Sequence, residues 1–463
     1  MVVGLRGSNL QQVNVAEYIQ SQIPQGGLFA GQQWRIATQP FALDAKLVKE
    51  LETLGRVLLQ FNRAVNLLYR QSYSGKQPAW IAQWLDAGKP QWLIDLQRSK
   101  ALKNDVSAVI RPDILLTEDG FSITELDSVP GGIGLTGWLN RAYSAASEAA
   151  WNLLGGADGM INGFRDIFKT QFRGEGRVHI VVSEESATYR PEMDWLCARI
   201  NESQNGNRFA VRDGKFQEVA PGDSIYRFIE LFDTENVPNA KLIFEKAAAG
   251  EHFVTPPPKP IFEEKMLFAL LWNRNLRDFW RRELGESFLA RMLKITPYTW
   301  LIDPTPLPPQ GAFPEINLTD WQQLKALSQR ERALVLKISG FSPQAWGSRG
   351  VYIGSDLAAE EWAVAVDTAI GAAGTNPYVL QKFQKPKTVP FEWHDFNSKT
   401  NVTMQGRVRL CPYYFVNGVG AEERANLGGV LATVVPADKK IVHGMTDAIL
   451  APCMEAPKAD GTA

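Results

Sequence analysis

Residues 111–127, RPDILLTEDGFSITELD, constrain the fold more than any other stretch of the chain. The triplet Glu118-Asp119-Gly120 is a turn signal, because glycine supplies the positive φ of a three-residue hairpin loop centred on Asp119. One face of the two predicted strands carries Leu115 and Ile123, and the other carries Ile114, Leu116, Thr124 and Leu126. Apolar residues on both faces predict a hairpin that is substantially buried.

The same hairpin places charged residues together near its open end. With the loop centred on Asp119, cross-strand pairing sets Asp113 opposite Glu125 and Arg111 opposite Asp127. Directly opposed Cβ atoms lie about 4.5–5.5 Å apart. Because side chains alternate along a strand, the three carboxylates share one face with Leu115 and Ile123.

Three clustered carboxylates need a source of positive charge if they are buried, since losing hydration costs several kcal/mol per ion. One arginine, Arg111, cannot neutralise all three. A hard divalent cation can, and oxygen-only ligands on rigid strands suit Mg²⁺, which usually completes its shell with water and phosphate oxygens. The alternative is that this end of the hairpin is solvated and the acids only keep it soluble.

The loop after the hairpin contains Gly132-Ile133-Gly134-Leu135-Thr136-Gly137, which matches the dinucleotide fingerprint G-x-G-x-x-G. The strand before it ends in carboxylates that would repel a pyrophosphate, and the acid expected about 20 residues later is missing. The glycines could instead let backbone N–H groups at a helix N-terminus approach a phosphate or an anionic substrate. A tight turn without a ligand is the third interpretation.

Motifs for covalent catalysis are not found in the sequence. It contains no G-x-x-x-x-G-K-[ST] phosphate loop, no G-x-S-x-G elbow and no suggested Cys–His pair.

Length and composition indicate a large globular protein. A chain of 463 residues with 45% hydrophobic residues suggests about three domains, or one multi-lobed enzyme with a real core. A formal net charge of −1 gives no global field toward nucleic acid or anionic lipid, so we expect neither as a partner. The oligomeric state cannot be read from the sequence.

Cysteine and histidine usage favours a reducing compartment without a zinc site. The three cysteines are Cys197, Cys411 and Cys453, which form no CxxC pair, and the four histidines are scattered. The first residues lack a signal-peptide core, and no apolar run approaches the roughly 18 residues needed to span a bilayer. We therefore expect a cytoplasmic protein.

The pattern of predicted elements divides the chain into four regions with a mixed α/β fold. Residues 1–110 are mainly helical, with one long amphipathic helix over residues 43–73. Residues 111–177 hold the hairpin and a following helix over 138–154. Residues 178–260 form a small α/β domain that the Pro-rich 255–260 closes. Residues 261–463 begin with a long helix over 263–284.

The charged end of the hairpin resembles a known metal-binding segment. Arg111 and Asp113 match an R-x-D motif, and Glu125 matches a glutamate twelve residues after that aspartate. This arrangement resembles the circularly permuted ATP-grasp enzymes, nearest to the synthetase domain of glutathionylspermidine synthases and their uncharacterised relatives. Asp127 departs from the family, which usually has asparagine there.

Further segments resemble the family in the same order over roughly residues 111–430. They are IYRFIELFD, the Pro-rich stretch with FEEKMLFALLW, VLKISG, GSRGVYIG and YVLQKF. In unpermuted ATP-grasp proteins the metal motif comes last, so only the permuted family explains this order. The resemblance implies an ATP-grasp-like multi-lobed fold with a helical N-terminal region, which the family match does not cover.

The resemblance also implies roles for individual residues, with ATP and Mg²⁺ as cofactors. Mg²⁺ would be held by Asp113, Glu125 and Asp127. Arg111 would contact the transferred phosphoryl group. The groups implied to contact ATP are Lys265 on a helix, Lys337 on a strand, Ser348, Arg349 and Gly350 in a lid loop, and Gln381 and Phe383 beside the adenine. Arg407 and Arg409 share a strand face and rank lower, because such arginines are often only solvated.

Three functions follow as hypotheses. The first is an ATP- and Mg²⁺-dependent ligase that joins a small-molecule carboxylate to an amine or thiol through an acyl phosphate. The second is a nucleotide-binding regulatory protein without turnover, which Asp127 in place of asparagine keeps open. The third is an NAD-dependent oxidoreductase that uses the GGIGLTG loop. The sequence does not identify the acid or the amine.

Overall fold

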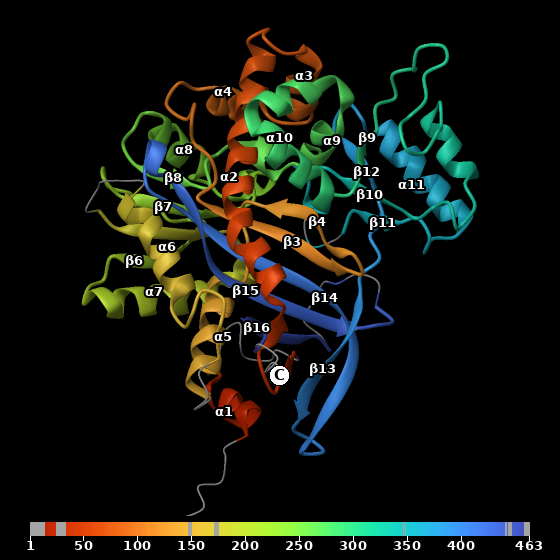
Figure 1. Ribbon diagram of the computed structural model, residues 1–463. Coiled ribbons are helices and arrows are strands. Elements are labelled where there is room, and N and C mark those ends of the chain that lie inside the picture. The colour runs from red at the N-terminus through yellow and green to blue at the C-terminus, as the bar shows by residue number, and fades with distance from the viewer. Residues whose placement is uncertain are drawn as a thin grey trace, which may run out of the picture.

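The computed structural model describes residues 14–24, 34–146, 151–170, 176–345, 347, 349–439, 442 and 447–457. Three β-sheets meet near the centre, and helices cover their outer sides (Figure 1). The α-helices are α1 (Val15–Gln22), α2 (Ala45–Tyr73), α3 (Ala79–Asp86), α4 (Gln91–Gln97), α5 (Ile133–Ala146), α6 (Gly159–Thr170), α7 (Arg190–Gln204), α8 (Ala240–Ala248), α9 (Leu267–Trp272), α10 (Arg277–Ile295) and α11 (Ala359–Gly371).

The large sheet contains the hairpin. Its strands run in the order β1-β16-β15-β14-β3-β4, with β13 paired to β14 and β2 paired to β16. Their bounds are β1 (Arg35–Ile36), β2 (Phe41–Leu43), β3 (Val109–Thr117), β4 (Gly120–Asp127), β13 (Thr388–Asp395), β14 (Thr400–Asn417), β15 (Arg424–Pro436) and β16 (Ile449–Glu455). The hairpin is thus joined to strands from the other end of the chain, because β3 pairs antiparallel with β14.

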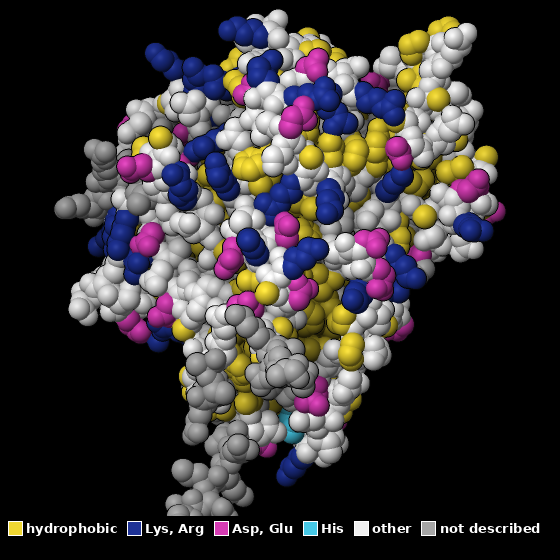
Figure 2. All heavy atoms as spheres, viewed as in Figure 1, with side chains coloured by type: hydrophobic (Ala, Val, Ile, Leu, Met, Phe, Trp, Pro, Cys, Tyr) yellow, Lys and Arg dark blue, Asp and Glu magenta, His cyan; other side chains and the backbone are white. Residues whose placement is uncertain are grey.

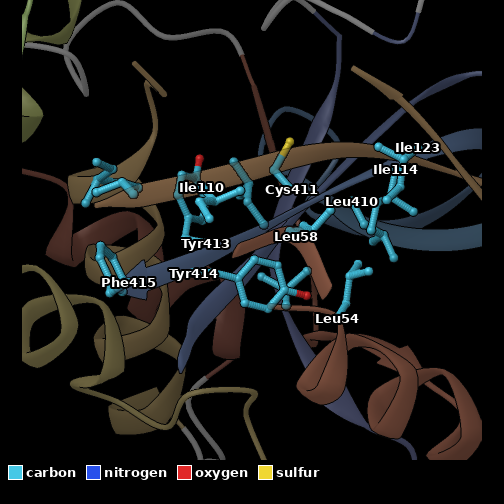
Figure 3. Close-up of a cluster of buried hydrophobic side chains, with 14 of the residues drawn as sticks. Leu54, Leu58, Ile110, Ile114, Ile123, Leu410, Cys411, Tyr413, Tyr414 and Phe415 are labelled. Carbon is cyan, nitrogen blue, oxygen red and sulfur yellow. The ribbon is translucent and has the colours of Figure 1, made fainter. Parts of the chain in front are cut away.

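The two faces of β14 have different neighbours because side chains alternate along a strand. Tyr414 faces α2, where its hydroxyl donates to the carbonyl of Leu51 at 2.6 Å. Tyr413 faces the opposite side, and its hydroxyl donates to the carbonyl of Gly131 at 2.7 Å. Figure 3 shows Leu54 and Leu58 of α2 in the cluster below the sheet, while the sulfur of Cys411 points away from them. One face of the sheet at β14 therefore packs in the hydrophobic core, and the opposite face is where a binding site can form.

Helix α2 confirms the long amphipathic helix predicted for residues 43–73. The side chain of Asp44 caps it by accepting from the Leu47 N–H at 2.9 Å. The helix ends at Ser74 and Gly75, where glycine has φ of +77°. Gly55 lets the helix approach the sheet, since a Cβ there would lie 2.5 Å from the carbonyl oxygen of Ala425.

The second and third sheets are smaller. The second has the order β11-β10-β12-β9 and is antiparallel, with β9 (Thr299–Leu301), β10 (Leu334–Ile338), β11 (Val351–Ile353) and β12 (Tyr378–Lys382). The third has the order β6-β5-β7-β8 and is parallel, with β5 (Val178–Val182), β6 (Phe209–Asp213), β7 (Ser224–Phe228) and β8 (Phe253–Thr255).

The single helix predicted over residues 263–284 is wrong, because the chain breaks there into several pieces. Asn273 takes an extended backbone after α9, and its side chain accepts from the Asn275 N–H at 2.9 Å. Such local side-chain bonds compete with helical ones. One residue past the predicted end, α10 is also interrupted at Gly285, which has φ of 73°. Lys265 consequently precedes α9 in a turn and is not on a helix.

The helix predicted over residues 138–154 also differs. Helix α5 begins earlier and ends at Ala146, and residues 147–150 lie outside the described residues. Beyond them Leu153 forms a bridge with Met454, and the Leu154 N–H donates to the carbonyl of Cys453 at 2.9 Å. Pairing with β16 thus replaces the last predicted helical turn, residues 151–154.

The visible surface in Figure 2 mixes Lys and Arg with Asp and Glu, so neither sign dominates this face. Within the described residues, no helix has the length and hydrophobicity needed to cross a membrane.

Candidate active site

A cavity of about 640 Å³ is lined by residues of all three sheets and their loops. Strands β3, β4, β14 and β15 form one wall, and β10 and β12 form another. The third wall comes from the segments after β5 and β7, which contribute Tyr189 and Glu230. The carboxyl ends of parallel strands are a common place for ligands in open α/β sheets.

The charged end of the hairpin lines this cavity in the predicted register. Arg111 pairs with Asp127, and Asp113 pairs with Glu125. All four side chains line the cavity. The carboxylates therefore face a ligand-sized space and are not spread over the outer surface.

The loop of the hairpin differs from the prediction. Thr117 pairs with Gly120, so the loop has two residues, and a bulge between Asp113 and Ile114 restores the register at the acids. The bulge leaves Thr124 outside the residue-by-residue pairing of the two strands, although its hydroxyl donates to the Asp113 carbonyl at 3.4 Å, and Ile123 then pairs with Ile114. Ile123 therefore lies in the core, and its predicted place on the carboxylate face is wrong.

Two arginines hold the aspartates. Arg111 Nη2 lies 3.0 Å from Asp113 Oδ1 and 2.8 Å from Asp127 Oδ2. Arg409 Nη1 lies 3.1 Å from Asp113 Oδ2, so Asp113 bridges two guanidinium groups. The Val129 N–H donates to Asp127 Oδ1 at 2.8 Å.

Arg409 and Arg407 have different environments although both lie on β14 two residues apart. Arg409 lines the cavity, whereas Arg407 Nη1 donates to the carbonyl of Lys439 at 3.1 Å. The sequence ranked Arg409 low because same-face arginines on a strand are often solvated, but β14 lies beside β3 and brings Arg409 to Asp113 in the cavity wall.

Lys265 is the cationic partner of Glu125, the third carboxylate of the hairpin. Its Nζ lies 3.0 Å from Glu125 Oε1 and donates to the carbonyl of Ala345 at 2.8 Å. Burial works to lower the pKa of Lys265, but Glu125, Glu230 and Asp127 together outweigh this effect and leave the pKa raised. Lys265 is thus a charged ammonium group in the cavity wall.

Lys337 and Gln381 interact in the middle of the second sheet. Lys337 Nζ donates to Gln381 Oε1 at 3.0 Å and to the carbonyl of Thr124 at 3.2 Å. Gln381 Nε2 donates to Thr299 Oγ1 at 3.1 Å. Burial lowers the pKa of Lys337. Phe383 also lines the cavity, just after β12.

The predicted lid loop lies over the same cavity. Arg349 lines it and forms an ion pair with Glu185, which follows β5 in the third sheet. Gly350 packs closely, since a Cβ there would lie 2.7 Å from the side chain of Ile338. Ser348 lies outside the described residues.

No group of three or more His, Cys, Asp or Glu side chains in the described ranges is arranged to hold a metal ion. The hairpin carboxylates contact cationic side chains instead. Burial raises the pKa of Asp127 despite the opposing effect of Arg111, and Asp113 adds to the rise. Arg111, Arg409 and Lys265 match the three carboxylates in charge here, and oxygen donors of this kind would suit a hard cation such as Mg²⁺.

The glycine loop before α5 is occupied by a protein carboxylate. Glu192 of α7 is fully buried and accepts the N–H of Gly132 at 2.7 Å and of Leu135 at 2.9 Å. Gly134 allows this approach, since a Cβ there would lie 2.1 Å from the Glu192 carbonyl oxygen. These N–H groups are therefore engaged by Glu192, which argues against both ligand-binding interpretations of GGIGLTG.

Glu192 predicts a pH dependence of stability. Burial raises its pKa to about 7, against the opposing bonds from Leu135 and Gly132. Because the native state then holds a proton that the unfolded state has released, this group's stabilisation is complete below about pH 4.5 and is lost as the pH rises to about 7. The loss is roughly 3 kcal/mol. Urea unfolding of the wild type and Glu192→Gln across this range measures it.

The matched control for that experiment is Glu202→Gln, which changes an exposed glutamate of the same helix. We expect the stability difference between Glu192→Gln and wild type to change with pH, and that of Glu202→Gln to stay constant. A difference for Glu192→Gln that is flat from pH 4.5 to 7.5 contradicts the assignment.

Glu230 and Glu263 are acids that the sequence interpretation missed. Both line the cavity, and Glu263 Oε1 lies 2.7 Å from Arg227 Nη2. Burial raises the pKa of Glu230 well above its ordinary value, and Glu263 and Asp127 raise it further. The signal for Glu230 was available, because it follows a buried strand of the parallel sheet, at the carboxyl end where ligands bind.

Comparison with known proteins gives a likeness in fold only. No protein-family model matches the sequence, and a search of curated proteins gives no significant match. Among solved structures, a glutathione synthetase-like effector from Globodera pallida aligns with a TM-score of 0.53 and 11% identity, over 96% of each chain. This likeness supports the predicted mixed α/β, ATP-grasp-like fold class.

A weaker match is a provisionally assigned gamma-glutamylcysteine synthetase from Methylobacillus flagellatus. It aligns with a TM-score of 0.36 and 10% identity, over 90% of this chain and 87% of the other. A TM-score this low supports no argument about the present chain.

Proposed function

We propose that this protein is an ATP- and Mg²⁺-dependent ligase that joins a small-molecule carboxylate to an amine or thiol through an acyl phosphate. One observation carries the proposal. A single cavity gathers three carboxylates of one hairpin with the cationic groups Arg111, Lys265, Lys337, Arg349 and Arg409. Phosphoryl transfer needs positioned charge and few protein nucleophiles, and this cavity supplies that arrangement.

The ion pairs in the cavity support a route by which the site would accept a nucleotide. Lys265 forms an ion pair with Glu125, and Arg409 forms an ion pair with Asp113. Phosphate oxygens would replace the carboxylates as partners of these cationic side chains. The released carboxylates Asp113, Glu125 and Asp127 would then hold Mg²⁺. Mg²⁺, when bound, neutralises phosphate charge. The exchange keeps each buried charge compensated, which a low-dielectric site requires.

The wall formed by the second sheet suits the nucleotide base. Val335, Ile353 and Phe383 line the cavity there and offer apolar contacts to an adenine. Lys337 lies on the same sheet and would reach a phosphate oxygen once it leaves Gln381. Gln381 would then have a free side-chain oxygen.

The other end of the cavity would hold the two substrates. A carboxylate oxygen attacks the terminal phosphorus of ATP, and ADP leaves. Arg111 and Arg409 would stabilise the charge on the transferred group by hydrogen bonds. The amine nitrogen then attacks the acyl carbon, and phosphate leaves. Glu230 lines the cavity and would, as a carboxylate, take the proton that the amine loses.

Closure would protect the acyl phosphate from water. Lys265 bonds to the carbonyl of Ala345, and Arg349, which lines the cavity, pairs with Glu185. Both contacts join the lid loop to other lobes. A closed site of this kind limits hydrolysis of a reactive intermediate.

A nucleotide-binding protein without turnover is the second candidate. The observation in its favour is the close pair between Asp127 and Arg111, with 2.8 Å between Oδ2 and Nη2. The resembling family has asparagine at this position, which cannot form that ion pair. Arg111 would then be less available to a phosphoryl group.

Ligand-dependent stability and product release test the proposal. We expect ATP with Mg²⁺ to raise the unfolding temperature, and ATP without Mg²⁺ or NAD to leave it nearly unchanged. We also expect ADP release that needs both a carboxylic acid and an amine from a mixed panel. Protection by MgATP without ADP release favours the second candidate. No protection by MgATP would sink both.

A further inference from the structure

A buried ion pair joins the N-terminal helices to the candidate active site. Lys89, in the turn between α3 and α4, pairs with Glu264, and their side chains are 0% and 1% exposed. Glu264 immediately precedes Lys265. A fully buried pair loses most of its hydration, so neither partner is a chance surface contact.

Ser339 transmits this contact to Lys265. The Ser339 hydroxyl donates to Glu264 Oε2 and accepts from the Met266 N–H at 2.9 Å. The Ser339 carbonyl accepts from the Lys265 N–H at 3.1 Å. Ser339 itself follows Ile338, the last residue of the strand that carries Lys337. Two consecutive amides, one of them that of Lys265, are thus fixed to the end of β10.

The helical region holds Lys89 on a rigid support. Asp86 ends α3 and accepts from the Tyr69 hydroxyl at 2.7 Å and from Gln97 Nε2 at 3.0 Å. Gly88 then turns the chain with φ of +72°, and a Cβ there would lie 1.9 Å from the carbonyl oxygen of Thr375. The turn therefore presses against the lobe that contains the second sheet.

We propose that Lys89 is a positioning residue, through which the N-terminal helical region sets the place of Lys265 in the site. Lys89 balances the charge of Glu264, Glu264 orients the hydroxyl of Ser339, and Ser339 holds the backbone of Lys265. The assignment rests on the proposed function, since the effect on catalysis follows from the role of Lys265 toward ATP.

Hydrogen–deuterium exchange of Lys89→Met tests the contact without any ligand. We expect the amides of Lys265 and Met266 to exchange at least tenfold faster, relative to amides of β14 that report global unfolding. The matched control is Lys259→Met, which removes another buried lysine, bonded to Asn66 Oδ1 at 3.0 Å and the carbonyl of Asp105 at 2.8 Å. We expect Lys259→Met to leave the exchange rates of the Lys265 and Met266 amides, relative to the amides of β14, unchanged.

Nucleotide measurements extend the same series. In Lys89→Met we expect the KM for MgATP to rise about tenfold with a smaller fall in kcat, and Lys259→Met to change neither beyond twofold. Adding Glu264→Gln to Lys89→Met should restore much of the amide protection, because the uncompensated buried charge is gone. Ser339→Ala should speed the exchange of the Met266 amide, because it removes the hydroxyl that accepts from the Met266 N–H.

The outcomes separate the two proposals. Unchanged protection of Lys265 and Met266 in Lys89→Met overturns the positioning role. If Lys89→Met fails to fold, Lys89→Gln replaces it, and unchanged protection in that variant overturns the role in the same way. If the wild type does not bind MgATP, the proposed function fails, while the exchange ratios still report whether Lys89 holds Lys265.

Discussion

Glu125→Gln should remove the Mg²⁺-dependent protection by ATP and slow ligation on the order of a thousandfold. The substitution keeps the size of the side chain but deletes the charge that pairs with Lys265 at 3.0 Å. It also removes an anionic oxygen donor that a hard cation needs. Unfolding temperatures with ATP, with and without Mg²⁺, and initial rates of ADP release measure the two effects.

The same substitution at Glu118 is the control. Glu118 lies in the exposed turn of the same hairpin, so Glu118→Gln changes the net charge equally but leaves the cavity intact. We expect wild-type protection and rate from it. If Glu125→Gln keeps full Mg²⁺-dependent protection, Glu125 is not a metal ligand, and the roles of Asp113 and Asp127 lose their main support.

Arg409→Met should lower the ligation rate by a few hundredfold or more and destabilise the protein by roughly 2 kcal/mol. Arg409 bonds Asp113 Oδ2 at 3.1 Å in a half-buried setting, so its loss leaves one carboxylate oxygen without its charged partner. Arg111 still holds the other oxygen, which limits the cost in stability. Steady-state kinetics measures the ligation rate, and urea unfolding measures the change in the free energy of unfolding.

Arg407→Met separates this effect from the loss of any arginine on the strand. Arg407 lies two positions away on β14 and donates to a carbonyl outside the cavity. We expect its rate to stay within about threefold of the wild type. Equal losses in the two variants would mean that strand packing, and not the charge at Asp113, explains the result.

The candidate site was largely accessible from the sequence where local rules apply. Alternation along two strands placed Arg111 against Asp127 and Asp113 against Glu125, as observed, although the predicted three-residue loop was wrong. The two-residue loop and the bulge at Thr124 changed the residues nearer the turn. The acids kept their register because the extra bulge residue offsets the residue missing from the loop.

Charge partners were harder to predict because they lie far away along the chain. Arg409 is 296 residues from Asp113, and only the pairing of β14 with β3 makes them neighbours. Glu192 reaches the glycine loop from another helix, and Lys89 reaches Glu264 from the N-terminal region. Periodicity within a segment contains no information about such contacts.

The sequence by itself determined the long helix α2, the buried hairpin and the face on which its carboxylates lie, since backbone geometry repeats every two or 3.6 residues. The tertiary structure alone decided which cations compensate those carboxylates and which N–H groups remain available to a ligand. The physical reason is that a buried charge is stable only beside its partner, and the partners here come from strands and helices that meet only in the folded protein.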